Sequence, residues 1–276
     1  MTRNRSNRGR VIAWSAAAFS LLLAASLAIL NAPPQIYAEN AIVIDAGSGE
    51  VLYAKNADST RPVASTQKIV TALVALDSDL LEKQVTIEES DTDCEPTRLD
   101  LMPGEVYTRG TLAKALIVRS GNDAARALAR DIGGSRERFS ALMNRKAASL
   151  GMRNSRFVNS NGLPAPGQYS TARDIAIAAR HAYRSDTIRS WSSTRSYPFQ
   201  YASGRTKVLE NTNQLLDSVP YCDGMKTGTT DRAGRCLVAT GTHNGRSVIA
   251  VVLNSTPRYI WDDSEKLLRW ALESPR

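Results

Sequence analysis

Strand-like segments occur at both ends of this 276-residue chain, and helical patterns fill the length between them. Near the N-terminus, residues 41–45 and 51–54 are apolar runs on either side of a Gly-Ser-Gly turn, a pattern typical of a β-hairpin. The strand pattern returns late, over residues 225–229, 236–242 and 248–253. We therefore expect an α/β (α+β) fold, in which one antiparallel sheet built from N- and C-terminal strands is flanked by helices, with a helical insert.

The central part of the chain has the periodicity of buried helices. Apolar residues recur at Ile69, Ala72, Leu73 and Leu76, the spacing that puts side chains on one helix face. We expect this helix to begin near Ala64, just after a proline. Similar patterns predict helices over residues 112–132, 136–150 and 263–272. Because no repeat or low-complexity linker interrupts residues 39–276, we expect a single domain there.

The first 38 residues differ from the rest of the chain. Four arginines precede residue 11, no acidic residue occurs before Glu39, and residues 11–30 carry no charge. A basic segment followed by an apolar one is typical of a secretory signal peptide. We expect residues 1–38 to be a signal peptide or an N-terminal membrane anchor, with membrane contact through residues 11–30. Ala28 and Ala38 both suit cleavage, and the protein is expected in the periplasm or cell envelope.

Charge and histidine content argue against several classes of protein. The 35 Lys and Arg residues outnumber the 27 Asp and Glu residues, for a net charge of +8, but the basic residues do not form a block interleaved with aromatic residues. Nucleic-acid recognition is therefore not expected. With His181 and His243 as the only histidines, a His-rich metal site or a Ser-His-Asp triad has little support. We expect neither a metal nor another cofactor.

The three cysteines form no CxxC pair, which argues against zinc ribbons and thioredoxin-type redox centres. Cys222 and Cys236 flank one predicted strand and its turn. Outside the cytoplasm they can form a disulfide, and two buried thiols are the alternative. Cys94 would then remain unpaired, and without a histidine partner it is a poor candidate nucleophile.

The first candidate site is Ser65-Thr66-Gln67-Lys68, at the predicted start of the first long helix. Residues i and i+3 share a helix face, so the Lys68 amine can approach the Ser65 hydroxyl. Free N–H groups at the helix N-terminus can stabilise an oxyanion. A lysine held neutral by burial or by a second cation can act as the base. We therefore expect Ser65 as nucleophile and Lys68 as base, although the four letters alone are a weak signal.

A second motif, Ser120-Gly121-Asn122, lies where one helical pattern ends and another begins. In such a loop a hydroxyl and an amide can converge on one pocket. Ser120 can relay a proton, and Asn122 can bind a substrate carbonyl or position Lys68. A helix cap is the alternative interpretation of this tripeptide.

The third motif is Lys226-Thr227-Gly228, followed by Thr229, on the first late strand. Lys226 and Thr227 supply a positive charge and a hydroxyl, which suit a carboxylate. Gly228 leaves room for an extended substrate beside the strand, and the Thr229 N–H can complete an oxyanion hole. An ordinary strand that ends in a glycine turn is the alternative.

The three motifs occur together and in order, each in the context that its chemistry needs. With them, the chain resembles the low-molecular-mass penicillin-binding proteins, the serine-type D-Ala-D-Ala carboxypeptidases, which are related to DD-endopeptidases and class A β-lactamases. The resemblance implies the β-lactamase/DD-peptidase-like fold and covers about residues 35–272. The family-like segments are residues 61–65, 120–125, 150–152, 169–174, 211–213 and 223–228.

The resemblance implies an acyl-enzyme mechanism. Ser65 would attack the penultimate D-Ala of a peptidoglycan stem peptide ending in D-Ala-D-Ala, and the terminal D-Ala would leave. Lys68 would be the general base, and Ser120 would pass the proton to the leaving amine. β-Lactam antibiotics are implied as covalent inhibitors that acylate Ser65.

The resemblance also implies how the substrate is held. Lys226 and Thr227 would bind the terminal carboxylate, Asn122 the peptide amide, and the backbone N–H groups of Ser65 and Thr229 the oxyanion. An arginine that assists carboxylate binding in many family members does not align cleanly around residues 256–258, so Arg258 is left outside the predicted site.

Alternatives to a carboxypeptidase stay open. Larger family members carry an additional C-terminal β-rich domain, whereas this chain stops at Arg276, so membrane attachment is expected only through the N-terminus. Short members include endopeptidases that cut D-Ala cross-links. A class A β-lactamase needs a deacylating glutamate, but no E-x-x-L-N occurs and S-G-N replaces S-D-N. The intact motifs argue against a silent wall-binding protein.

Overall fold

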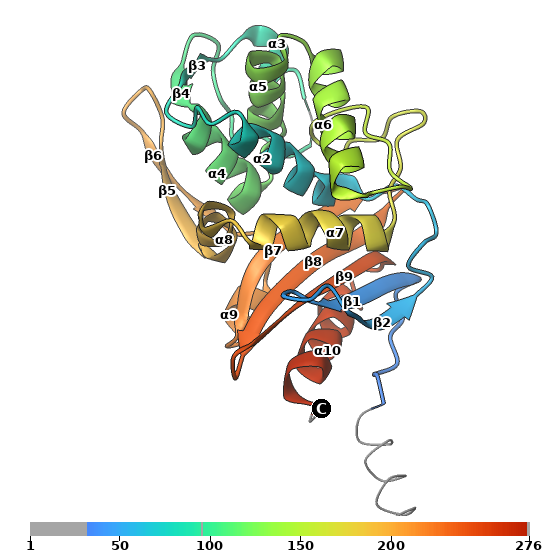
Figure 1. Ribbon diagram of the computed structural model, residues 1–276. Coiled ribbons are helices and arrows are strands. Elements are labelled where there is room, and N and C mark those ends of the chain that lie inside the picture. Colours follow the sequence, from blue (N-terminus) through green and yellow to red (C-terminus); the bar gives the residue numbers. More distant parts are fainter. Residues whose placement is uncertain (1–31, 95, 275–276) are drawn as a thin grey trace, which may run out of the picture.

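The computed structural model describes residues 32–94 and 96–274 and has a central sheet with helices on both faces (Figure 1). The strands of the central sheet are β1 (Asn40–Asp45), β2 (Val51–Lys55), β7 (Cys222–Thr230), β8 (Gly234–His243) and β9 (Arg246–Ser255). They are antiparallel and lie in the order β2-β1-β9-β8-β7. Because β1 pairs with β9, the two ends of the chain form one sheet, which confirms the predicted architecture.

The central strands of this sheet are buried on both faces. Leu237 and Val252 lie opposite each other and join the apolar cluster beneath α10 (Ile260–Glu273). Val238 and Val251, one residue along each strand, join the cluster on the other face. Successive strand residues point to opposite faces, and each fully buried Val or Leu contributes about 1.5–3 kcal/mol. The strand that carries the third motif is therefore anchored to a firmly packed neighbour.

The face of the sheet opposite α10 is covered by α7 and α8, and the remaining long helices stack beyond them (Figure 1). The helical elements are η1 (Ala64–Gln67), α2 (Lys68–Asp77), α3 (Glu89–Thr92), α4 (Arg109–Arg119), α5 (Asn122–Gly133), α6 (Arg136–Leu150), α7 (Ala172–Tyr183), α8 (Asp186–Ser193) and α9 (Leu215–Ser218). Two small sheets pair β3 (Gln84–Thr86) with β4 (Val106–Thr108) and β5 (Ser196–Gln200) with β6 (Thr206–Glu210). These four strands were not predicted from the sequence pattern.

The helical stretch predicted over residues 112–132 is broken where the second motif lies. The Ser120 N–H donates to the Leu116 carbonyl over 3.1 Å and closes α4. Ser120 itself has a φ of 70°, in the left-handed region that non-glycine residues rarely adopt. Asn122 then begins α5. Both polar side chains of the motif are thus held between two helix ends.

Residues 36–38 pack against the body of the fold. The backbone N–H groups of Tyr37 and Ala38 donate to the buried carboxylate of Asp263 over 3.0 and 2.7 Å. The Tyr37 ring stacks on Tyr259 with centroids 3.9 Å apart, and Lys55 Nζ donates to the Ile36 carbonyl over 2.9 Å. This short segment therefore joins β1 to the start of α10.

The expected signal or anchor segment, residues 11–30, lies outside the described residues. Within residues 32–94 and 96–274, none of the helices combines the length and the apolar composition needed to cross a bilayer.

The disulfide considered between Cys222 and Cys236 is not present. Cys222 lies opposite Gly241 and Cys236 opposite Gly228, toward different ends of the β7-β8 ladder. All three cysteines are free and buried. Burial raises the pKa of Cys222 and of Cys236 to about 11, so both are unreactive thiols at neutral pH. The alternative of two buried thiols is the one the fold adopts.

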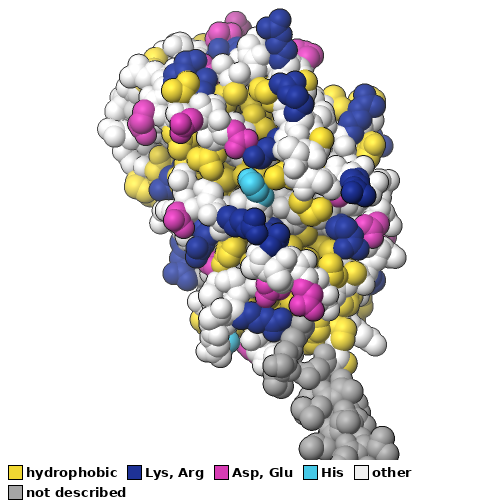
Figure 2. All heavy atoms as spheres, viewed as in Figure 1, with side chains coloured by type: hydrophobic (Ala, Val, Ile, Leu, Met, Phe, Trp, Pro, Cys, Tyr) yellow, Lys and Arg dark blue, Asp and Glu magenta, His cyan; other side chains and the backbone are white. Residues whose placement is uncertain are grey.

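Charges on the face seen in Figure 2 are dispersed, with Asp and Glu side chains among the Lys and Arg side chains. Ion pairs at the surface, such as Arg173 with Asp58 at 2.7 Å, join side chains that are 37% and 59% exposed. Pairs of this kind contribute about 0–1 kcal/mol each, so the fold depends on its apolar clusters.

Candidate active site

Ser65 lies in η1, the single turn that leads into α2. Ala64, just before it, has a φ of 48°, an unfavourable value for a residue with a side chain. Such strain persists only where the surroundings enforce it, and it is common at functional sites. Ser65 is half-buried and lines a cavity of about 420 Å³, called the Ser65 cavity below.

Lys68 is fully buried directly behind Ser65. Its Nζ lies 2.8 Å from Ser65 Oγ, 2.7 Å from Asn122 Oδ1 and 2.7 Å from the Asn161 carbonyl oxygen. A neutral amine has two N–H donors and one lone pair. The two carbonyl-type oxygens can accept those donors, and the lone pair is then directed at the Ser65 hydroxyl. This geometry suits a base that removes the Ser65 proton.

The environment of Lys68 favours the neutral amine. Burial is the largest cause that lowers its pKa well below the usual 10.5, and the positive charge of Lys226 acts in the same direction. Cys94 and Asp123 oppose this effect. A buried lysine beside another cation is the arrangement that yields a free amine base near neutral pH.

The loop at residues 159–162 completes the surroundings of Lys68, a role that the sequence analysis did not predict. Its contribution is a backbone carbonyl, that of Asn161, which side-chain chemistry cannot reveal. Gly162 has a φ of 86°, and a Cβ there would lie 2.2 Å from the Ala64 carbonyl oxygen. The Gly162 N–H also donates to Asn159 Oδ1 over 2.8 Å. The glycine is therefore what lets this loop close on η1.

Ser120 and Asn122 of the second motif reach the site from the end of α4 and the start of α5. Ser120 lines the Ser65 cavity, whereas Asn122 is buried and accepts the hydrogen bond from Lys68. The Asn122 N–H donates to the Thr97 carbonyl over 2.8 Å. Asp123, next in sequence, accepts from the Leu99 N–H over 2.8 Å. These bonds tie the motif to the segment at residues 97–99.

Strand β7 brings the third motif against η1. A Cβ on Gly228 would lie 2.9 Å from the backbone nitrogens of Ser65 and Thr66. Glycine is thus required for the strand to approach the nucleophile this closely. Thr227, Gly228 and Thr229 line the Ser65 cavity, so the structure brings the three motifs together.

Lys226, which the sequence predicts to bind a carboxylate, directly precedes the three cavity-lining residues of strand β7. Its side chain is buried, with 1% exposure, and its Nζ donates to the Thr227 carbonyl over 3.1 Å. Burial lowers its pKa to about 7. In this arrangement Lys226 acts on the electrostatics of Lys68 from behind the cavity wall.

Further polar residues line the Ser65 cavity that the predicted site did not include. Thr227 Oγ1 donates to Thr212 Oγ1 over 2.6 Å, and Thr212 belongs to a segment already noted as family-like. Arg119 and Arg235 also line the cavity. Arg235 follows the turn after the third motif. Pairing the strand that carries this motif with the next strand would have placed Arg235 beside Thr229 and so in the site. Arg258 instead lies over the Tyr259 ring, 5.1 Å from its centroid.

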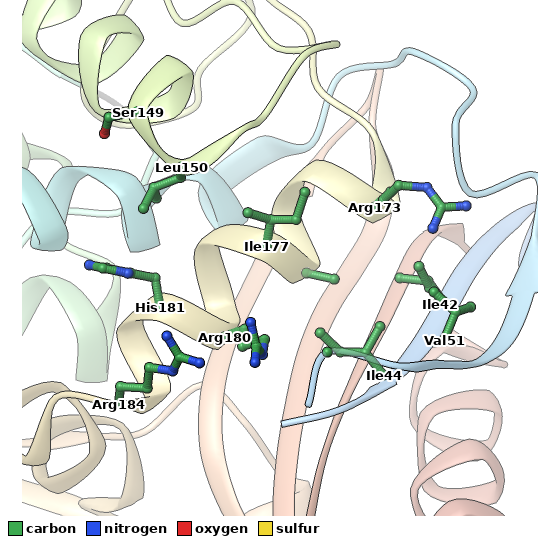
Figure 3. A pocket seen from close by; sticks show the side chains of 12 residues that line it. Ile42, Ile44, Val51, Ser149, Leu150, Arg173, Ile177, Arg180, His181 and Arg184 are labelled. Carbon is green, nitrogen blue, oxygen red and sulfur yellow. The ribbon is translucent and has the colours of Figure 1, made fainter. Parts of the chain in front are cut away.

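A second cavity, of about 490 Å³, lies between β1, the C-terminal end of α6 and α7 (Figure 3). Ile42, Ile44 and Ile177 line its apolar part, and His181 and Arg184 lie beside it. None of its described lining residues belongs to the three motifs. Its larger volume therefore does not make it the better candidate for the reaction.

The described part of the chain shows no cluster of side chains typical of a metal site. Among residues 32–94 and 96–274, no group of three or more His, Cys, Asp or Glu side chains is arranged to hold an ion. The Ser65 cavity offers a hydroxyl, a buried amine and backbone N–H groups. That set suits acyl transfer through a covalent serine ester.

Comparisons with known proteins agree with this chemistry. The D-alanyl-D-alanine carboxypeptidase family matches residues 28–257 of this chain. The chain is 36% identical to the D-alanyl-D-alanine carboxypeptidase DacF of Bacillus subtilis over 80% of this chain and 58% of that protein. It is 38% identical to DacC of Escherichia coli, also a D-alanyl-D-alanine carboxypeptidase, over 86% of this chain and 62% of that protein. The chain thus spans about three fifths of the length of these two relatives.

Other similarities extend over most of both chains. A D-alanyl-D-alanine endopeptidase of Pseudomonas aeruginosa is 32% identical over 91% of this chain and 85% of that protein. The crystal structure of the Streptomyces K15 DD-transpeptidase superposes with a TM-score of 0.83 at 33% identity. The superposition covers 88% of this chain and 99% of the transpeptidase chain.

Proposed function

The chain belongs to the D-alanyl-D-alanine carboxypeptidase family, and on that premise we propose that it is a serine-type carboxypeptidase acting on peptidoglycan. It acylates on Ser65 and removes the terminal D-Ala from stem peptides ending in D-Ala-D-Ala. The observation that carries the proposal is the 2.8 Å separation of the buried Lys68 Nζ and Ser65 Oγ at the cavity that β7 borders.

In the acylation step, Lys68 takes the Ser65 hydroxyl proton as Oγ attacks the carbonyl carbon of the penultimate D-Ala. The developing oxyanion is stabilised by the backbone N–H groups of Ser65 and Thr229. The carbon–nitrogen bond then breaks. Ser120 gives its proton to the departing amine of D-Ala and takes the proton that Lys68 removed from Ser65, so Lys68 is again a neutral amine. The product is an ester between Ser65 and the shortened peptide.

In the deacylation step, water attacks the ester with Lys68 as base, and the proton returns to Ser65 Oγ. The shortened peptide leaves with a new carboxylate. Asn122 keeps Lys68 oriented through both steps, because its Oδ1 holds one N–H of the amine. Thr227 and Gly228 border the bound terminal residue on the strand side.

A DD-endopeptidase that cuts D-Ala cross-links is the second candidate function. One relative with 32% identity is named an endopeptidase and is matched over 85% of its length. Mass spectrometry of muropeptides before and after treatment separates the two activities. Loss of a single D-Ala marks the carboxypeptidase, and conversion of cross-linked dimers to monomers marks the endopeptidase.

Slow turnover of β-lactams is part of the proposal. Among the described residues that line the Ser65 cavity there is no Asp or Glu, so a carboxylate that activates water for rapid β-lactam hydrolysis is missing from that lining. Penicillin should therefore acylate Ser65 and stay attached. Rapid multiple turnover of penicillin would instead favour a β-lactamase.

Export to the periplasm or cell envelope is proposed from the basic and apolar composition of residues 1–30. Contact with the membrane is proposed through residues 11–30, as a leader or as a retained anchor. We propose that the single domain predicted over residues 39–276 begins before Ile36, because residues 36–38 pack on Asp263.

The direct test incubates the purified protein with a pentapeptide that ends in D-Ala-D-Ala and measures free D-Ala. Release by the wild type and its loss in Ser65→Ala are expected. Labelling of Ser65 by a fluorescent penicillin gives an independent readout of the same nucleophile. Full activity of Ser65→Ala would contradict the proposal.

A further inference from the structure

Arg235 is an exposed cation inside the Ser65 cavity that the mechanism above does not use. It is the second residue of β8, directly opposite Thr229 in the β7-β8 pairing. Directly opposed residues project from the same face of a sheet. Arg235 Nη1 donates to Thr229 Oγ1 over 3.2 Å. Its guanidinium is therefore held beside the strand along which the substrate lies.

The backbone around Arg235 fixes this placement. Gly234, just before it, has a φ of 66°, and a Cβ there would lie 2.8 Å from Asn254 Oδ1. The pairing of β8 with β9 is irregular between Arg235 and Leu237. An irregularity of this kind re-aims side chains next to functional sites. The turn and the irregularity together direct Arg235 to the cavity.

The terminal carboxylate of a D-Ala-D-Ala peptide needs a cation within hydrogen-bond reach. Lys226 is a weak provider, because its ammonium is buried and has a pKa of about 7. Arg258 points its guanidinium at Tyr259 and is not among the cavity-lining residues. A guanidinium stays charged at physiological pH and can pair with a carboxylate through two parallel hydrogen bonds.

We propose that Arg235 is a substrate-binding residue that holds the terminal carboxylate, together with the hydroxyl groups of Thr227 and Thr229. The inference rests on the proposed DD-peptidase function. It assigns recognition of the free carboxyl end to a residue outside the three motifs. Arg235 thereby favours substrates with a charged terminus over substrates with a neutral one.

Arg119 provides a matched comparison. It also lines the cavity and is exposed, but it ends α4 on the side of Ser120 rather than on the β7-β8 side. Removing its charge lowers the net charge of the cavity lining by one unit, as removing the charge of Arg235 does. It does not remove the cation that contacts Thr229.

The test compares wild type, Arg235→Gln, Arg235→Lys and Arg119→Gln on a D-Ala-D-Ala peptide and on the same peptide with a C-terminal amide. For the carboxylate peptide, Arg235→Gln should lower kcat/KM about 10- to 100-fold, mostly through KM. Arg235→Lys should recover part of this loss. Arg119→Gln should change kcat/KM less than about 3-fold.

On the amide peptide, all variants should stay within about 3-fold of the wild type, since no carboxylate is present. An equal loss on both peptides, or no loss in Arg235→Gln while the wild type releases D-Ala, would overturn the role of Arg235 alone. Failure of the wild type to release D-Ala would overturn the proposed function and this inference with it. Thermal unfolding of each variant confirms that the fold is intact.

Discussion

The Nζ of Lys68 lies 2.8 Å from the Oγ of Ser65, and the same nitrogen is held by Asn122 and by the carbonyl of Asn161. These contacts come from three separate parts of the chain. One is η1, one is the start of α5, and one is the loop at residues 159–162. The base is therefore fixed by the fold as a whole, and its orientation does not depend on its own helix alone.

Replacing Lys68 with methionine should abolish the activation of Ser65 while keeping most of the buried volume. We expect acylation by a fluorescent penicillin to slow by about 10²- to 10⁴-fold, the usual contribution of a positioned general base. In the wild type the rate should rise with pH as Lys68 loses its proton, at pH values well below the usual 10.5. Stopped-flow measurement from pH 5 to 9 checks both statements. A wild-type rate in Lys68→Met would assign the base elsewhere.

Because Lys226 is buried and loses its charge near pH 7 in the folded state, the free energy of unfolding should increase as the pH rises above 7. Burial lowers the pKa of Lys226 to about 7 from the usual 10.5, so between these pH values the unfolded chain binds more protons than the folded one. Stability must then rise with pH, by up to about 1.4 kcal/mol per pH unit. Guanidinium unfolding at pH 7, 8 and 9 measures this slope.

The control for this slope is Lys226→Met, which removes one titrating group and should reduce the slope of stability against pH. The buried thiols act in the opposite direction only above pH 9, because Cys222 and Cys236 have pKa values raised from 9 to about 11. The interval from pH 7 to 9 therefore excludes the thiols. Lys68, whose pKa is also lowered by burial, contributes to the slope in both proteins, so the difference between the wild type and Lys226→Met measures the contribution of Lys226. An unchanged slope in Lys226→Met would contradict the assignment.

The sheet and the three motifs could be predicted from sequence because each has a local pattern. Alternating or continuous apolar runs marked β1, β2 and the late strands, and the spacing of Ser65 and Lys68 marked a shared helix face. Strands β3 and β4 were missed because three residues carry too little periodicity. Strands β5 and β6 lack the continuous apolar run that marked β2.

Contacts made by backbone atoms or across strands could not be predicted from single residues. The Asn161 carbonyl is invisible to reasoning from side-chain chemistry, and its position depends on Gly162 packing against Ala64. The role of Arg235 depends on which residue lies opposite Thr229. The burial of Lys226 depends on the packing of β7 against the helices.

Gly228→Ala should impair the reaction without a large loss of stability. The added Cβ would lie 2.9 Å from the backbone nitrogens of Ser65 and Thr66, so β7 must move away from η1. We expect penicillin acylation to fall by about 10- to 100-fold, since small displacements of reacting groups have effects of this size. Gly110→Ala is a suitable control, because its Cβ meets only ordinary contacts of 3.4 Å or more. Equal acylation rates in both variants would argue against a close strand approach.

The segment before β1 should be needed for stability, which bears on where a leader can be removed. A protein that begins at residue 39 lacks the N–H groups of Tyr37 and Ala38, so the fully buried carboxylate of Asp263 loses both hydrogen bonds. Hydrogen bonds to a charged group contribute about 1.5–3 kcal/mol each, and an unpaired buried charge is costly. We expect the free energy of unfolding to fall by about 3 kcal/mol or more relative to a protein that begins at residue 32.

Denaturant unfolding of the two truncated proteins measures this difference directly. Asp263→Asn in the longer protein is the matched control, because it removes the charge but keeps the side-chain volume and an acceptor oxygen. Asp263→Asn should lower the free energy of unfolding less than the truncation does, because the truncation also removes the stacking of Tyr37 on Tyr259. N-terminal sequencing of the protein recovered from cells should then find a start at or before Ile36. A fully stable protein starting at Glu39 would show that residues 36–38 are dispensable and that cleavage after Ala38 is compatible with the fold.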